Sequence, residues 1–192
     1  MTHGFSRHRR SGACVATFTA FEADLLRSLA GQLVELLRNE AASPQGVDPL
    51  EEMFDFSGPT SEPDDPVLAR LLPNAYPEDD EAAADFRRFT ESGLRDGKAD
   101  AAASVVESLE EAGLPAEPED GLYIDVELDE GESMSWLRCL TDMRLALATR
   151  LGVEEGDEDY WEALPPKDPR AQVHDIYDWL GFLQETLVRS IE

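Results

Sequence analysis

The stretch that decides the fold runs from Leu122 to Leu151 and reads LYIDVELDEGESMSWLRCLTDMRLALATRL. Its first seven residues alternate apolar and polar side chains, a pattern that predicts a strand with one buried face. Asp129 and Glu132 follow with the spacing of a capping box, in which each side chain satisfies a backbone donor at the start of a helix. The helix then carries leucines along one line, at positions 137, 140, 147 and 151. We therefore expect a strand and a helix that pack together.

An earlier stretch repeats this order of a short strand and a capped helix. Residues 13–19 are rich in β-prone side chains, and Thr19 with Glu22 forms a second capping box. The helix that this box opens is expected to run to about Asn39. Its apolar face consists of six leucines, at positions 25, 26, 29, 33, 36 and 37. The shared order suggests that the two strands pair with each other.

Further helical segments are expected over residues 65–72, about 78–113 and 168–190. Together the segments predict a mainly α fold, a helical bundle-like single domain with a small two-stranded β element. Residues 1–12 are expected to be a flexible basic tail and residues 13–192 the domain. A mobile acidic loop is expected within the domain at about 41–65, where Pro, Gly, Ser, Asp and Glu dominate.

The segment at about 78–113 carries two features that bear on its structure. Gly93 and Gly97 interrupt a run of helix-forming residues, which predicts two helices or one broken helix. Phe86 and Phe89 lie three residues apart and are therefore expected to share one face of the helix, pointing into the core.

The charge of the chain is strongly negative. Its 192 residues include 42 acidic and 16 basic side chains, a formal net charge of −26. Such a surface repels phosphate backbones and anionic membranes, so we expect neither direct DNA binding nor membrane association. No stretch approaches the roughly 20 apolar residues of a membrane span, and we expect a cytoplasmic location. The basic cluster Arg7, His8, Arg9 and Arg10 is an exception that could touch an acidic partner or a phosphate, or form a solvated tail.

The sequence contains no motif typical of a catalytic, nucleotide or metal site. We therefore expect neither an enzyme nor a bound cofactor or metal. An enzyme without a motif would need carboxylates from separate helices to converge in one cleft. The two cysteines, Cys14 and Cys139, are the redox candidates, because an exposed thiol beside a cation such as Arg10 or Arg138 can be reactive. The alternative is that both are small core residues.

Four side chains are candidates for contact with a protein partner: Arg87, Arg88, Trp161 and Trp179. Arginine and aromatic side chains are enriched where proteins bind one another. The two arginines also form a distinct basic pair inside an acidic chain. The alternatives are salt bridges on a helix surface and packing in the core.

Several short motifs, taken in order, resemble one known family. They are DP at 65–66, RLLPNAY at 70–76, FRRFT at 86–90, WLRCLTDMRLAL at 136–147 and YDWLGFLQE at 177–185. Together they resemble an actinomycete domain-of-unknown-function family that includes the AosR oxidative-stress regulators and is encoded near ClpS. The resemblance extends from about residue 13 to the end of the chain.

This resemblance implies a redox-linked transcription regulator. Such a protein would act through contact with an alternative sigma factor, of the extracytoplasmic-function class, or with RNA polymerase, and would promote cysteine synthesis under oxidative stress. An acidic surface suits a basic partner, because attraction between opposite charges speeds their encounter. The alternative is a non-catalytic adaptor in ClpS-linked proteolysis or sulfur metabolism, in which the two cysteines would be dispensable.

Overall fold

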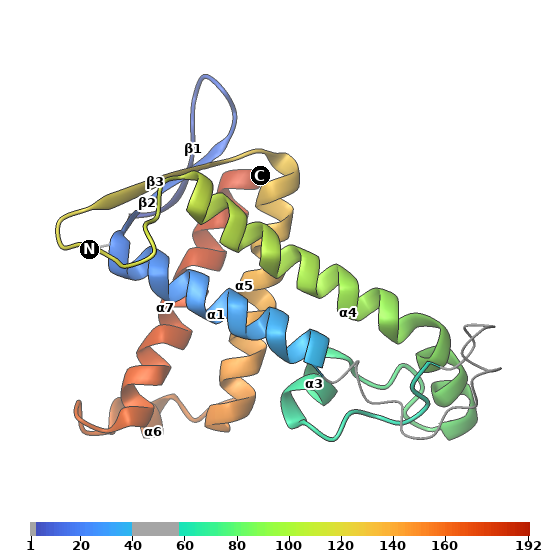
Figure 1. Cartoon of the computed structure of the whole chain (residues 1–192). Helices are drawn as coiled ribbons and strands as arrows, with labels where there is room; N and C mark the ends of the chain where they lie inside the picture. The colour runs from blue at the N-terminus through green and yellow to red at the C-terminus, as the bar shows by residue number, and fades with distance from the viewer. Residues whose placement is uncertain (1–2, 40–57) are drawn as a thin grey trace.

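The computed structural model describes residues 3–39 and 58–192, and within them the fold is mainly α, as the sequence predicts. Figure 1 shows long helices that descend from a small sheet. The strands are β1 (His3–Arg7), β2 (Cys14–Thr19) and β3 (Tyr123–Leu128). The helices are α1 (Ala20–Asn39), α3 (Pro66–Leu71), α4 (Asp80–Glu111), α5 (Glu130–Leu151), α6 (Glu158–Glu162) and α7 (Pro169–Ile191).

The strands form one antiparallel sheet in the order β1-β2-β3. Cys14 of β2 lies opposite Leu128 of β3, and Thr19 lies opposite Tyr123. This pairing confirms that the two units of strand and capped helix meet through their strands. Strand β3 buries alternate side chains, as its sequence pattern predicts. The sheet has a third strand, β1, where the sequence predicts a two-stranded element.

Strand β1 lies within residues 1–12, the segment that the sequence analysis takes for a flexible basic tail. A turn that ends at Gly12, which has a φ of 76°, reverses the chain so that β1 pairs antiparallel with β2. Its buried side chain, Phe5, packs edge-on against Phe18 and Trp136 at centroid distances of 5.9 and 5.5 Å. One buried phenylalanine among polar residues produces no alternating pattern, which is why the sequence does not reveal this strand.

Both predicted capping boxes form. The backbone N–H of Glu132 donates to the Asp129 carboxylate at 2.8 Å, and the backbone N–H of Asp129 donates to the Glu132 carboxylate at 2.8 Å. In the other box, the backbone N–H of Thr19 donates to the Glu22 carboxylate at 2.8 Å, and the backbone N–H of Glu22 donates to the Thr19 hydroxyl at 3.2 Å. These local bonds fix the residues at which β2 and β3 end and α1 and α5 begin.

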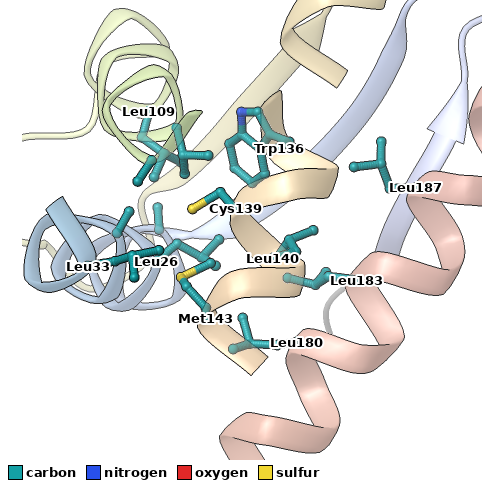
Figure 2. Close-up of a cluster of buried hydrophobic side chains, with 14 of the residues drawn as sticks. Leu26, Leu33, Leu109, Trp136, Cys139, Leu140, Met143, Leu180, Leu183 and Leu187 are labelled. Atoms are coloured by element: carbon teal, nitrogen blue, oxygen red, sulfur yellow. The ribbon is translucent and has the colours of Figure 1, made fainter. Parts of the chain in front are cut away.

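Helix α5 is at the centre of the hydrophobic core. Figure 2 shows Cys139 facing α1 and α4, while Leu140 faces α7. Near the start of α5, Trp136 is fully buried, and its indole N–H donates to the Ser108 hydroxyl of α4 at 2.8 Å. Leucines of the three surrounding helices complete the cluster: Leu26 and Leu33 of α1, Leu109 of α4, and Leu180, Leu183 and Leu187 of α7. Helix α5 therefore joins α7 to the pair formed by α1 and α4.

Helix α4 is continuous over 32 residues, although its two glycines predict two helices or a broken helix. Its orientation also differs from the prediction. Phe86 and Phe89 have exposed fractions of 42% and 63% and therefore point outward. The inward face carries residues four apart instead, Ala83, Arg87, Glu91, Arg95 and Ala99.

A buried ion triplet occupies this inward face of α4. Glu91 is 2% exposed, and its two carboxylate oxygens lie 2.5 Å from Nη1 of Arg87 and 2.7 Å from Nη2 of Arg95. Arg87 also donates to the carbonyl of Leu72 at 3.2 Å, and Arg95 donates to the carbonyl of Leu37 at 3.3 Å. Buried charges are tolerated when they are paired and hydrogen-bonded. The triplet thus fastens α4 to the ends of α1 and α3.

The acidic loop predicted at about 41–65 falls largely on residues 40–57, which lie outside the described residues. Its last residue, Asp65, caps α3 by accepting a hydrogen bond from the backbone N–H of Val67 at 2.7 Å. Asp65 also pairs with Arg150 of α5 at 2.6 Å, and these contacts place α3 against α5.

Candidate functional site

Cys139 lies in the core on α5, with an exposed fraction of 0%. Figure 2 shows its sulfur between α1 and α4, near Leu26 and Leu109. Burial, and next the negative charge of nearby Asp142, raise the pKa of the Cys139 thiol to about 12. The thiolate is the nucleophilic form of cysteine. Cys139 is therefore held in its unreactive form at neutral pH.

Asp142 is a buried carboxylate on the same helix. Burial raises its pKa, and a hydrogen bond from Lys98 at 2.7 Å opposes this shift only in part. Lys98 belongs to α4, so the pair links α4 to α5. This pair of one carboxylate with one lysine is a cross-link between the two helices.

Cys14 has different surroundings. It begins β2, is 4% exposed, and lies opposite Arg7 of β1. It lines an open hollow of about 590 Å³ between the β1–β2 turn, the start of α5 and the end of α7. Both cysteines are free thiols. Both thiols are buried in the same hydrophobic core, where Cys14 borders the hollow and Cys139 faces α1 and α4.

Three of the four predicted partner-contact residues are used inside the protein. Arg87 belongs to the buried ion triplet and is 6% exposed. Trp161 is 7% exposed, stacks on His174 at a centroid distance of 4.7 Å, and donates its indole N–H to Asp157 at 2.7 Å. Trp179 is half-buried and packs against the core. In this conformation, these three side chains stabilise the fold.

The fourth candidate, Arg88, adjoins an exposed aromatic patch near the start of α4. We define the α4 aromatic patch as Tyr76, which precedes the helix, together with Phe86 and Phe89 of the helix; they are 47%, 42% and 63% exposed. Tyr76 and Phe86 meet edge-on at 5.8 Å, and the Arg88 guanidinium lies 4.9 Å from the ring centre of Phe89. Arg88 also pairs with Asp85 at 2.9 Å. Grouped exposed aromatic side chains are a frequent mark of a protein-binding surface.

Sequence reasoning missed this patch because it assigned both phenylalanines to the core. The signal that could have found it is the stripe of residues four apart, from Ala83 through Arg87, Glu91 and Arg95 to Ala99. Two alanines at its ends indicate close packing, and the alternating charges between them are complementary. A helix that buries this stripe turns Phe86 and Phe89 toward solvent.

The basic cluster of residues 7–10 begins at the last residue of β1 and continues into the turn toward β2, and all four side chains are exposed. Figure 1 shows this hairpin projecting from the sheet. Ser11 orders the turn, because its hydroxyl lies 2.8 Å from Nδ1 of His8 and donates to Glu127 of β3 at 3.1 Å. The cluster is therefore a structured basic projection from an acidic protein.

Within residues 3–39 and 58–192, no three His, Cys, Asp or Glu side chains cluster as metal ligands would. Among the helices of the same ranges, none has both the length and the apolar character needed to cross a membrane.

Comparison with known proteins identifies a family and its relatives. The model of a family described as "Domain of unknown function (DUF2017)" matches residues 2–191. A protein of Mycobacterium leprae named putative oxidative stress regulator AosR is 34% identical over 184 residues, which cover 88% of this chain and 78% of the relative. The oxidative stress regulator AosR of Mycobacterium tuberculosis is 33% identical over 182 residues, covering 87% of this chain and 77% of the relative. No solved structure gives a significant match.

Proposed function

The chain belongs to the DUF2017 family, and from this premise we propose that it is a regulator of the oxidative stress response. The observation that carries the proposal is the similarity to relatives named oxidative stress regulators over most of both chains. In its full form, the proposal is a non-catalytic cytoplasmic protein that contacts an alternative sigma factor or RNA polymerase. Through this contact it would promote cysteine synthesis when the cell is oxidised.

Two surface features support action through protein contact. The α4 aromatic patch offers exposed apolar side chains next to Arg88, and aromatic and arginine side chains supply much of the binding energy at interfaces. The net charge of −26 attracts a partner with a basic surface and speeds their encounter. Sigma factors and RNA polymerase present basic surfaces, because they must hold the phosphates of DNA.

The surroundings of the two thiols support a redox response that begins at Cys14. Both thiols are buried, with exposed fractions of 4% for Cys14 and 0% for Cys139. They differ because Cys139 has a raised pKa that keeps it protonated, whereas Cys14 lines an open hollow whose walls include the β1–β2 turn and the start of α5. A modification of Cys14 would therefore act directly on the contact between the hairpin and the helix bundle.

A tagged pull-down from the native host, with and without the thiol oxidant diamide, tests the proposal. We expect an alternative sigma factor or a subunit of RNA polymerase to be enriched after oxidation. Cys14→Ser should abolish the dependence on oxidant, and the matched substitution Cys139→Ser should retain it. Recovery of ClpS or of sulfur-pathway proteins in equal amounts under both conditions would replace the regulator by the adaptor function.

Replacing Phe86 and Phe89 together by alanine should weaken binding of the captured partner by about 2 kcal/mol or more, as expected for aromatic hot spots. The fold should survive, because both rings are largely exposed. Titration calorimetry with purified partner measures the effect. Phe182→Ala is the matched control, since Phe182 is 43% exposed on α7, outside the patch. Equal binding by the double variant and the unchanged protein would show that the α4 aromatic patch is not the contact surface.

A further inference from the structure

The hollow beside Cys14 combines several kinds of polar group. The β1–β2 turn, the start of α5 and the end of α7, whose ribbons all lie near the top of Figure 1, border this open hollow. Its volume is about 590 Å³. The lining includes one thiol, three hydroxyls, one guanidinium and two carboxylates, from Cys14, Ser11, Ser133, Ser190, Arg7, Asp129 and Glu130. Such a hollow is large enough for a molecule of the size of an amino acid.

Ser133 indicates that the hollow receives a polar group. Its side chain is 2% exposed, and within the described part of the chain its Oγ has no hydrogen-bond partner. The other two hydroxyls of the lining have partners, because Ser190 donates to the carbonyl of Thr186 at 2.7 Å and Ser11 donates to Glu127 at 3.1 Å. Buried hydroxyls almost always find a partner in native proteins. A ligand in the hollow would supply one for Ser133.

The charges around the hollow define the class of ligand. Arg7 is exposed and, among the described residues, has no carboxylate within salt-bridge distance. Asp129 and Glu130 lie at the start of α5, where the Asp129 carboxylate already accepts a hydrogen bond from Glu132. A ligand with a single sign of charge would be repelled by one of these two sets. A small zwitterion can place its carboxylate near Arg7 and its ammonium near the two acidic residues.

We propose that Cys14 is a modification site that forms a mixed disulfide with a small zwitterionic thiol, delivered as its symmetrical disulfide. The Cys14 thiol loses its proton to water, and its sulfur attacks one sulfur of the disulfide. The new bond joins Cys14 Sγ to that half, the original S–S bond breaks, and the leaving thiolate takes up a proton. Cys14 is oxidised and the released half is reduced, so no other oxidant is needed. The biological meaning of this step, as the input of the regulator, rests on the proposed function.

Intact-mass spectrometry and peptide mapping of the purified full chain test this proposal. The probes are cystine, which is zwitterionic, cystamine, which is cationic, and dithiodiglycolate, which is anionic. We expect one half-cystine on the peptide that contains Cys14 and fastest reaction with cystine. Cys14→Ser should remove the adduct and Cys139→Ser should retain it. Ser133→Ala should slow the reaction about fivefold, the factor of one ordinary hydrogen bond, whereas Ser135→Ala on the same helix should not.

Several results would overturn the proposal. They are an adduct on Cys139 rather than Cys14, no adduct on the folded protein although both thiols react in denaturant, or equal rates for the three probes. Because no partner is present in this experiment, its failure is distinct from that of the regulator. An adduct on Cys14 that leaves partner binding unchanged would contradict the proposed function alone. Oxidant-dependent partner binding without a Cys14 adduct would contradict this inference alone.

Discussion

Replacing Glu91 by alanine is expected to lower the free energy of unfolding by about 3–5 kcal/mol. The substitution removes the carboxylate that the buried guanidiniums of Arg87 and Arg95 share, at distances of 2.5 and 2.7 Å. Buried cations that lose their counter-charge are costly, because the interior solvates them poorly. Chemical denaturation followed by circular dichroism measures the loss.

An exposed ion pair provides the control for Glu91→Ala. Glu185 and Arg189 are also four residues apart on a helix, but both are largely exposed. Glu185→Ala should therefore change the free energy of unfolding by less than about 0.5 kcal/mol. A loss below about 1 kcal/mol for Glu91→Ala would show that the triplet does not hold α4 as described.

Replacing Trp136 by alanine is likewise expected to lower the free energy of unfolding by about 3–5 kcal/mol. The indole is fully buried between the sheet and α4, packs against Phe5 and Phe18, and donates to Ser108. Its removal leaves a cavity at the point where β1, β2 and α4 meet. Thermal and chemical unfolding measure the effect, and the near-ultraviolet circular dichroism of the aromatic cluster should weaken as well.

Two variants separate the causes of the Trp136 effect. Trp136→Phe keeps most of the side-chain volume but loses the indole N–H, so it should lower the free energy of unfolding by about 1–2 kcal/mol. Phe89→Ala truncates an aromatic side chain that is 63% exposed and should cost less than about 1 kcal/mol. Equal losses for Trp136→Ala and Phe89→Ala would contradict the position of Trp136 at the centre of the core.

The parts of the fold that sequence predicts well are those fixed by local interactions. The capping boxes at Thr19 and Asp129 depend on side chains three residues away, and both form as expected. The alternation of apolar and polar side chains in β3 predicts a strand with one buried face, and the structure confirms that alternate side chains are buried. In both cases the signal lies within a few residues of the element that it predicts. The pairing of β2 with β3 joins segments that are distant in the sequence, and the repeated order of strand and capped helix is what indicates it.

The orientation of α4 could not be obtained in the same way. Hydrophobic periodicity treats charged residues as outward and phenylalanines as inward. Here Arg87 and Arg95 are buried because both pair with Glu91 and each donates a further hydrogen bond to a backbone carbonyl, that of Leu72 for Arg87 and that of Leu37 for Arg95. Those carbonyls belong to distant segments, so the stabilisation of the buried charges depends on tertiary structure. The same limit applies to β1, whose burial rests on the contacts of Phe5 with other elements.

In the candidate sites too, the sequence predicts some features and only the tertiary fold determines the others. Composition identifies Cys14 and Cys139 as the two thiols, but their environments depend on the tertiary fold. Cys139 is enclosed by α1 and α4, whereas the hollow at Cys14 needs β1, α5 and α7 together. Residue type favours Trp161 as a contact residue, yet it stacks on His174, donates a hydrogen bond to Asp157 and is buried. Residue type predicts which side chains suit a protein interface, whereas their exposure depends on the tertiary fold.

The affinity of the purified chain for RNA polymerase holoenzymes that carry the alternative sigma factors of the host tests the central claim most directly. The measurement compares the dissociation constant of the reduced protein with that of the oxidised protein and of oxidised Cys14→Ser. We predict that oxidation of the unchanged chain tightens binding to one holoenzyme by about tenfold or more, a difference of about 1.4 kcal/mol. Cys14→Ser should bind as the reduced protein does. The same affinity for all three proteins, with every holoenzyme tested, would contradict a redox-linked regulator.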